Sequence, residues 1–202
     1  MADFTKRTLL AGLGVFGASR VLAQAAPVRP SVIFSTGDGP ITIELAVDKA
    51  PLTSANFLRY VDAHRLDRTR FYRAMKIVPD PLNGLIQGGV GGMAVELFPP
   101  VAHESTTQTG LRHVNGTISL ARNAPGSATC DFFICVGPVP SLDADPTATG
   151  DNLGFAAFGQ VTDGMDVVRN ILLSPTSPTE GEGVMKGQML DPTVPIVTVR
   201  RV

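Results

Sequence analysis

Short apolar segments separated by turn residues recur along most of the chain. Short runs that are rich in Val, Ile, Phe and Thr are typical of β-strands. We predict strands over residues 32–34, 41–45, 71–77, 85–87, 116–121, 130–136, 155–161 and 196–201. The pair Asp38-Gly39 lies between the first two of these strands and indicates a β-hairpin there.

Two segments carry apolar residues at helical spacing instead. Pro51 suits the first turn of a helix, and the pattern that follows predicts a helix over residues 52–63. A second helix is predicted over residues 165–173. The apolar positions that support the two helices are Phe57, Leu58, Val61, Met165, Val168, Ile171 and Leu172. Many short strands and two separated helices favour a mainly β fold, a barrel with helices over its ends.

Two further segments are rich in turn residues and are predicted to be irregular. Residues 79–84 (Pro-Asp-Pro-Leu-Asn-Gly) form a turn-rich insertion between two predicted strands. Residues 174–195 are rich in Pro, Gly, Thr and Ser, which predicts a long surface loop rather than a linker to another domain. The length of 202 residues fits a single domain.

The first 25 residues differ in kind from the rest. Lys6 and Arg7 precede a stretch of small and apolar residues, and small residues stand at the −3 and −1 positions before a cleavage site after Ala25. This layout predicts a secretory signal peptide over residues 1–25 and a mature domain over 26–202, in the periplasm or secreted. The export route stays open, because the Lys-Arg pair is one substitution short of a twin-arginine signal. The alternative is a short membrane anchor or amphipathic helix. The run is short for a membrane span, so we expect no stable insertion after cleavage.

The composition sets limits on partners and on cysteine chemistry. The net charge of −1 gives no reason to expect a nucleic-acid partner, and we expect a monomer. Cys130 and Cys135 lie on one predicted strand, where five steps of roughly 3.3 Å separate their Cα atoms by about 16 Å. A disulfide needs roughly 4.4–6.8 Å. The odd spacing also points the two side chains to opposite faces, so we expect no bridge between them and neither a metal ligand nor a nucleophile.

Searches for common catalytic patterns find little. The histidines His64, His103 and His113 are too widely spaced for a metal-binding pattern, which favours surface or hydrogen-bonded structural roles. The sequence has no Gly-x-Ser-x-Gly motif, no phosphate-binding loop and no dinucleotide-binding fingerprint. We therefore expect neither a metal nor a cofactor.

Two segments carry a combination of residues that is more specific. The first is Phe71-Tyr72-Arg73 with Leu85-Ile86-Gln87-Gly88-Gly89, and the second is Leu120-Ala121-Arg122 with Asp131-Phe132-Phe133-Ile134. Here the chain resembles the cyclophilins, whose signature runs Phe-His-Arg, Gln-Gly-Gly, Ala-Asn or Ala-Arg, and Ser-Gln-Phe-Phe-Ile. The resemblance extends over about residues 32–199. It implies a closed antiparallel eight-stranded β-barrel capped by two α-helices, and a peptidyl-prolyl cis-trans isomerase that assists the folding of exported proteins.

The resemblance also implies roles for individual residues. Arg73 matches the catalytic arginine, which would donate a hydrogen bond to the prolyl nitrogen, and Gln87 matches the glutamine that orients it. The other positions that match the binding site for proline-containing polypeptide segments are Phe133, Leu85, Leu142, Ala121, Arg122, Asp131 and Phe155. Phe133 would form the floor under the proline ring, Leu85 and Leu142 its apolar wall, and Ala121-Arg122 the edge that binds the substrate backbone.

Several positions depart from the family pattern. Asp131 replaces a glutamine, Ser141 replaces an aromatic residue of the pocket rim, and Phe155 replaces a histidine. The Asp131 carboxylate could hold the Arg73 guanidinium in place or draw it away from substrate as an ion pair. These departures leave an alternative open, a non-catalytic proline-peptide-binding or chaperone module with the same fold. A purely structural barrel is disfavoured by the combination of Arg73, Gln87 and Phe133.

Overall fold

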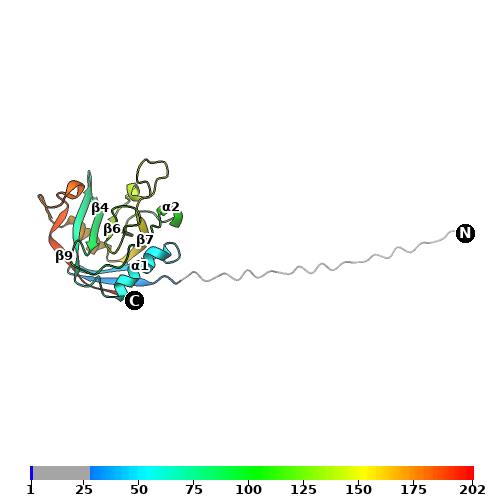
Figure 1. Cartoon of the computed structure of the whole chain (residues 1–202), viewed down its shortest axis with the longest axis horizontal. Helices are drawn as coiled ribbons and strands as arrows, with labels where there is room; N and C mark the ends of the chain where they lie inside the picture. The colour runs from blue at the N-terminus through cyan, green and yellow to red at the C-terminus, as the bar shows by residue number, and fades with distance from the viewer. Residues whose placement is uncertain (2–27) are drawn as a thin grey trace.

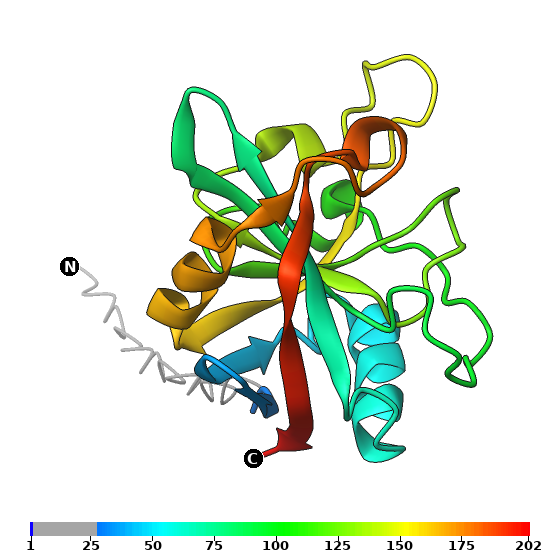
Figure 2. The same ribbon diagram turned by 90° about the vertical axis from the view of Figure 1, so that its left-hand side faces the viewer.

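Eight antiparallel strands close into a barrel. The computed structural model describes Met1 and residues 28–202, so the predicted signal peptide lies outside the described residues. Around the barrel the strands follow the order β1 (Ser31–Thr36), β2 (Gly39–Leu45), β7 (Ala156–Asp163), β5 (Thr117–Leu120), β6 (Phe132–Val136), β4 (Asp80–Gly89), β3 (Thr69–Ile77) and β9 (Met189–Arg201). Pairing of β9 with β1 closes the ring, and the two-residue strand β8 (Thr176–Ser177) adds to the edge of β9. The predicted eight-stranded closed barrel is confirmed (Figure 2).

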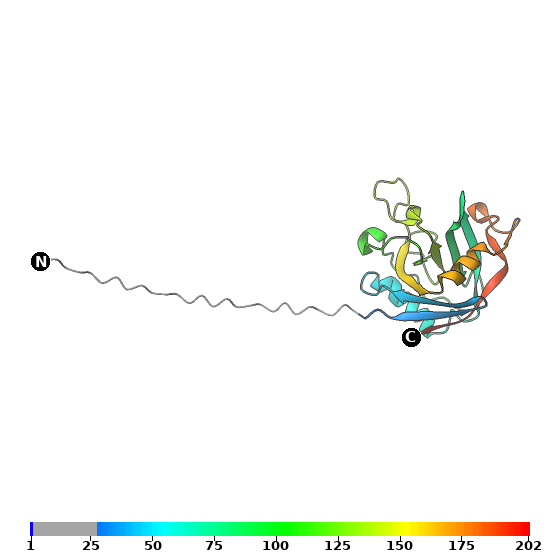
Figure 3. The same cartoon turned by 180° about the vertical axis from the view of Figure 1, so that it is seen from behind.

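The two predicted helices are present and lie on opposite sides of the barrel in Figure 2. Helix α1 (Pro51–Asp62) packs against β7 and β9, and α3 (Met165–Leu173) packs against β2, β3, β4 and β6. A single helical turn, α2 (Thr106–Thr109), was not predicted; it lies on the far side of the molecule from β9 (Figures 1 and 3). Two 3₁₀ turns, η1 (Pro140–Leu142) and η2 (Gly183–Met185), complete the elements. None of the described helices is both long and apolar enough to cross a membrane.

The two predicted loops are shorter than expected, because strand pairing extends into them. Ile77 pairs with Asp80 and Lys76 with Gly84, so β4 begins at Asp80 and a bulge in the hairpin contains the turn residues between these pairs. Strand β9 begins at Met189, within the segment predicted as a loop to residue 195. Its prolines fit because the fixed φ of proline suits extended backbone, and the Pro195 carbonyl still accepts a hydrogen bond from Gly37 N (2.9 Å).

Strand β6 begins at Phe132 rather than at Cys130, so the predicted strand over 130–136 was two residues too long at its start. Both cysteines are free thiols and both are buried, Cys130 in the main core and Cys135 in a separate apolar cluster on the other face of the sheet. Burial raises the pKa of Cys130 to about 11 and that of Cys135 to about 12. The prediction that these two residues do not form a disulfide with each other is confirmed.

Phe132 lies at the centre of an aromatic cluster inside the barrel. Its ring centroid lies 5.3 Å from that of Phe34, 5.9 Å from that of Phe57 and 5.8 Å from that of Phe71, and all four rings are fully buried. Neighbouring residues on a strand face opposite ways, so Phe133 points out of this core. It belongs to the second cluster with Cys135, on the outer face of β6.

The Phe132→Ala substitution tests this core. Removing a fully buried ring from the cluster is expected to lower the free energy of unfolding by about 3–5 kcal/mol, since a cavity remains behind. Urea unfolding followed by circular dichroism would measure the loss. Leu82→Ala is the control, because Leu82 is 57% exposed in the bulge of the β3–β4 hairpin and its removal should change little. A loss below about 1 kcal/mol for Phe132→Ala would contradict the described packing.

Candidate active site

Cross-strand pairing places three predicted site residues in one row. Arg73 on β3 is paired with Gln87 on β4, and Gln87 is in turn paired with Phe133 on β6. These side chains alternate with the core residues Ala74 and Ile86, so the row faces outward from the barrel. The sheet therefore brings together residues that are 60 positions apart in the chain.

A β-bulge brings a fourth residue into this row. The register shifts between Phe71, which pairs with Gly88, and Arg73, which pairs with Gln87, so Tyr72 is the extra residue of the bulge. As a result, both Tyr72 and Arg73 reach the same glutamine. Gln87 Nε2 donates to the Tyr72 hydroxyl (2.8 Å), while Gln87 Oε1 accepts from Arg73 Nη1 (2.8 Å).

The Arg73 guanidinium is fixed from two sides. Gln87 accepts one hydrogen bond from it, and Gln188 Oε1 accepts two more, from Nε (2.9 Å) and Nη2 (2.7 Å). Burial lowers the pKa of Arg73 from its ordinary value, but a guanidinium stays charged at any physiological pH. Because these contacts use three of its five N–H groups, two remain available to a ligand.

All nine predicted site residues line one open cavity of about 370 Å³, which falls in the usual range for small-ligand sites. They are Arg73, Leu85, Gln87, Ala121, Arg122, Asp131, Phe133, Leu142 and Phe155. The lining also contains residues that the sequence did not suggest, namely Met75, Asn123, Ser127, Thr129, Val184 and Met185. Ser141 is not among the residues that line the cavity.

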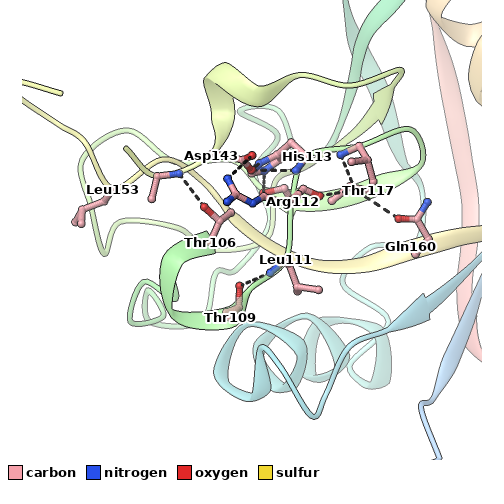
Figure 4. A network of polar contacts seen from close by, with 12 residues as sticks. Thr106, Thr109, Leu111, Arg112, His113, Thr117, Asp143, Leu153 and Gln160 are labelled. Carbon is pink, nitrogen blue, oxygen red and sulfur yellow. Dashed lines mark hydrogen bonds and ion pairs between the residues drawn. The ribbon is translucent and has the colours of Figure 1, made fainter. Parts of the chain in front are cut away.

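Two aromatic side chains pack against the ring of Phe133. The ring of Phe155 meets it edge-on at 5.3 Å, and the imidazole of His113 stacks against it at 5.7 Å. His113 is buried, with Nδ1 2.8 Å from Asp143 Oδ1 and Nε2 3.0 Å from Ser119 Oγ; Figure 4 shows the contact with Asp143. The prediction of a hydrogen-bonded structural role is confirmed for this histidine, and its task is to support the floor of the cavity.

Asp131 does not contact Arg73, contrary to both alternatives considered from the sequence. Its Oδ1 accepts from the backbone N–H groups of Val90 (2.7 Å) and Gly91 (3.2 Å), and its Oδ2 accepts from the Tyr72 hydroxyl (3.1 Å). Burial raises the pKa of Asp131, and these donors oppose the rise. Asp131 therefore reaches Arg73 only through Tyr72 and Gln87. A Cβ at Gly91, where φ is +51°, would come within 2.7 Å of the Tyr72 ring, so only glycine lets the ring sit here.

The side chain of Arg122 is engaged in holding the cavity wall. Its guanidinium forms an ion pair with Asp151 (2.5 Å), donates from Nε to the Gly154 carbonyl (2.9 Å) and lies 5.1 Å from the Phe155 ring. Only 4% of this side chain is exposed. The Arg122 guanidinium is therefore occupied by the wall, and the predicted role of Arg122 at the edge that binds the substrate backbone would fall to its main chain.

The burial of His113 leads us to predict that the stability of the fold depends on pH. Burial lowers the pKa of this histidine below the ordinary 6.5, and the hydrogen bond that His113 donates to the Asp143 carboxylate only partly opposes this. The unfolded chain therefore takes up a proton at a higher pH than the folded one, so the free energy of unfolding should fall as the pH drops below about 6.5, by at most about 1.4 kcal/mol per pH unit.

Urea unfolding between pH 7.5 and pH 5.5 measures this slope. The slope should shrink in His113→Gln and stay at the wild-type value in His64→Gln, whose side chain is 60% exposed. Equal slopes in the wild type and His113→Gln would contradict the assignment.

Comparison with known proteins agrees with this geometry. The family model described as "Cyclophilin type peptidyl-prolyl cis-trans isomerase/CLD" matches residues 31–200. A "Peptidyl-prolyl cis-trans isomerase" of Acinetobacter baylyi is 38% identical over 163 residues, which cover 78% of this chain and 79% of that protein. "Peptidyl-prolyl cis-trans isomerase B" of Escherichia coli is 37% identical over 148 residues, which cover 69% of this chain and 82% of that protein.

Solved structures share the fold at lower identity. The crystal structure of a cyclophilin-type peptidyl-prolyl cis-trans isomerase from Cryptosporidium parvum superposes with a TM-score of 0.65 at 19% identity, covering 87% of this chain and 98% of that one. A second structure of that protein, determined in the presence of the dipeptide Ala-Pro, gives a TM-score of 0.61 at 19% identity, with 84% and 97% covered. The family match and the two bacterial relatives show that the chain belongs to the cyclophilin-type peptidyl-prolyl cis-trans isomerases.

Proposed function

We propose that this chain catalyses the cis–trans isomerisation of prolyl peptide bonds, with Arg73 as the hydrogen-bond donor to the prolyl nitrogen and Phe133 as the surface on which the proline ring rests. The observation that carries the proposal is the paired row Arg73–Gln87–Phe133, which sets a fixed cationic donor beside an apolar floor. The relatives' names support the same activity.

The chemistry of the reaction explains why such a site suffices. A peptide bond resists rotation because resonance gives the C–N bond partial double-bond character, with a barrier near 18–20 kcal/mol. At the twisted state the nitrogen regains its lone pair and becomes a hydrogen-bond acceptor. A donor that forms its hydrogen bond to the lone pair only in this twisted state stabilises the transition state more than the ground state. No covalent bond is made or broken and no proton is transferred, so the proposed step uses neither a metal nor a cofactor.

Catalysis of this kind requires that the donor be held in place before the substrate arrives. Gln87 receives one Arg73 N–H, and its own amide is oriented by the Tyr72 hydroxyl. Tyr72 is in turn held by Asp131, which the backbone amides of Val90 and Gly91 anchor. Asp131 therefore serves as the end of a positioning chain rather than as a competitor for the guanidinium. This weakens one of the two reasons for a non-catalytic module, namely that Asp131 would draw Arg73 away; the other reason, the departure at Ser141, is unaffected.

We also propose where the activity is used. The N-terminal sequence has the layout of a signal peptide, which supports export to the periplasm or beyond. Exported proteins fold from unfolded chains in which prolyl isomerisation takes tens to hundreds of seconds. Proline-containing segments of such chains are the substrates proposed here, bound by a monomer.

The Arg73→Ala variant tests the proposed donor. Loss of a pre-positioned donor is expected to lower kcat/KM for a short Xaa-Pro peptide by about a hundred- to a thousandfold. Exchange NMR of the peptide measures the rate, and circular dichroism shows whether the fold is kept. Arg169→Ala, on α3 and outside the cavity lining, is the matched control and should keep wild-type activity. Equal activity in Arg73→Ala and wild type, or a wild type without activity, would overturn the proposal.

The Tyr72→Phe variant tests the positioning chain. It keeps the ring but removes the hydroxyl that accepts from Gln87 and donates to Asp131. Loss of about 1 kcal/mol of hydrogen bonding at this point should lower kcat roughly fivefold and leave KM unchanged, because the proline floor is untouched.

Tyr60→Phe provides the matched control. The Tyr60 hydroxyl accepts from Phe98 N (2.8 Å) away from the cavity, so its removal should lower stability without lowering kcat. If the two variants show the same kcat, the chain through Tyr72 does not position Arg73.

A further inference from the structure

The segment between β8 and β9, residues 178–188, borders the cavity on one side, and we call it the lip. In Figure 2 its 3₁₀ turn η2 lies at the same end of the barrel as the tip of the β3–β4 hairpin. Two apolar residues of this turn, Val184 (84% exposed) and Met185 (38% exposed), line the same cavity as Arg73. Their side chains therefore present apolar surface to whatever occupies the cavity.

Hydrogen bonds within the lip and from the lip to the barrel hold it in this position. Within it, Gly187 N donates to the Glu180 carbonyl (2.9 Å) and Gln188 N donates to the Met185 carbonyl (3.0 Å). It is fastened to the barrel where Ala74 N on β3 donates to the Gln188 carbonyl (2.9 Å). A subsite that is held in this way loses little conformational entropy when a ligand binds.

One side chain connects the lip to the guanidinium. Gln188 Nε2 donates to the Val184 carbonyl (2.8 Å), while its Oε1 accepts both hydrogen bonds from Arg73. The same amide group therefore sets the position of the apolar turn and that of the donor. Because Val184 and Met185 line the same cavity as Arg73, a polypeptide whose prolyl nitrogen lies at Arg73 can bring a residue next to the proline against them.

We propose that Val184 and Met185 form a second subsite, which binds an apolar side chain next to the proline, and that Gln188 positions this subsite and Arg73 together. The inference rests on the proposed function, because it takes the cavity as the place where the prolyl bond is held. It predicts that this chain prefers substrates with an apolar residue next to the proline.

Two pairs of peptides test the subsite, one with Leu or Ser before the proline and one with Leu or Ser after it. Titration followed by NMR measures the affinity of each peptide, and exchange NMR measures its isomerisation. The effect is expected for only one of the two pairs, the one that varies the neighbour of the proline that the subsite binds. In that pair, Val184→Ser should weaken binding of the Leu peptide roughly three- to tenfold and leave binding of the Ser peptide unchanged. Val197→Ser, at a 52% exposed valine outside the cavity lining, is the matched control and should change neither.

The outcomes separate this inference from the proposed function. If the wild type isomerises the peptides but Val184→Ser affects Leu and Ser peptides equally, or neither, the subsite is overturned and the function stands. If the wild type does not isomerise any peptide but Val184→Ser still weakens binding of a Leu peptide selectively, the subsite stands and the function fails.

Two substitutions of Gln188 test its positioning role. Gln188→Leu removes both the acceptor toward Arg73 and the donor toward Val184, so kcat should fall for Leu and Ser peptides alike and the preference for Leu should shrink. Gln188→Glu keeps an acceptor for Arg73 but lacks the donor, so it should retain more of kcat than Gln188→Leu while losing the same preference. Unchanged kcat in Gln188→Leu would refute the positioning role.

Discussion

The site depends on the restraint of a single guanidinium by two amide oxygens. Gln87 and Gln188 together accept three hydrogen bonds from Arg73, and they approach it from different parts of the chain, Gln87 from β4 and Gln188 from the residue immediately before β9. Long side chains are costly to order, so a charged group that is already held needs no further ordering when the substrate arrives. Tyr72 and Asp131 orient one of these amides, and His113 and Phe155 pack against the Phe133 floor beside the guanidinium.

The barrel supplies this restraint through its pairing register. Arg73, Gln87 and Phe133 are neighbours because β3, β4 and β6 are adjacent, and the bulge at Tyr72 turns one more side chain toward the same amide. The core on the inner face, centred on Phe132, keeps these strands in register. The function therefore depends on alternation along a strand: Phe132 stabilises the barrel, and Phe133 next to it forms the floor of the cavity.

Strand alternation and helical spacing along the chain were sufficient to predict a barrel and both longer helices, while the order of the motifs, through the resemblance to the cyclophilins, identified nine of the fifteen residues that line the cavity. The sequence was not sufficient for Gln188, because the contact with Arg73 requires β9 to pair with β3 more than a hundred residues away. The start of β9 was missed for a related reason, since its prolines favour a loop locally and only pairing makes them part of a strand. From the sequence, Asp131 was interpreted as a partner of the Arg73 guanidinium, whereas two backbone amides and a tyrosine bind it in the fold.

The most direct test of the central claim is a crystal structure of this chain with a proline-containing peptide in the cavity. The account predicts that the pyrrolidine ring packs on Phe133 and that an Arg73 nitrogen lies about 3 Å from the prolyl nitrogen, with the bonds to Gln87 and Gln188 kept. A proline bound elsewhere, or an Arg73 side chain turned away from the prolyl nitrogen toward solvent, would contradict it.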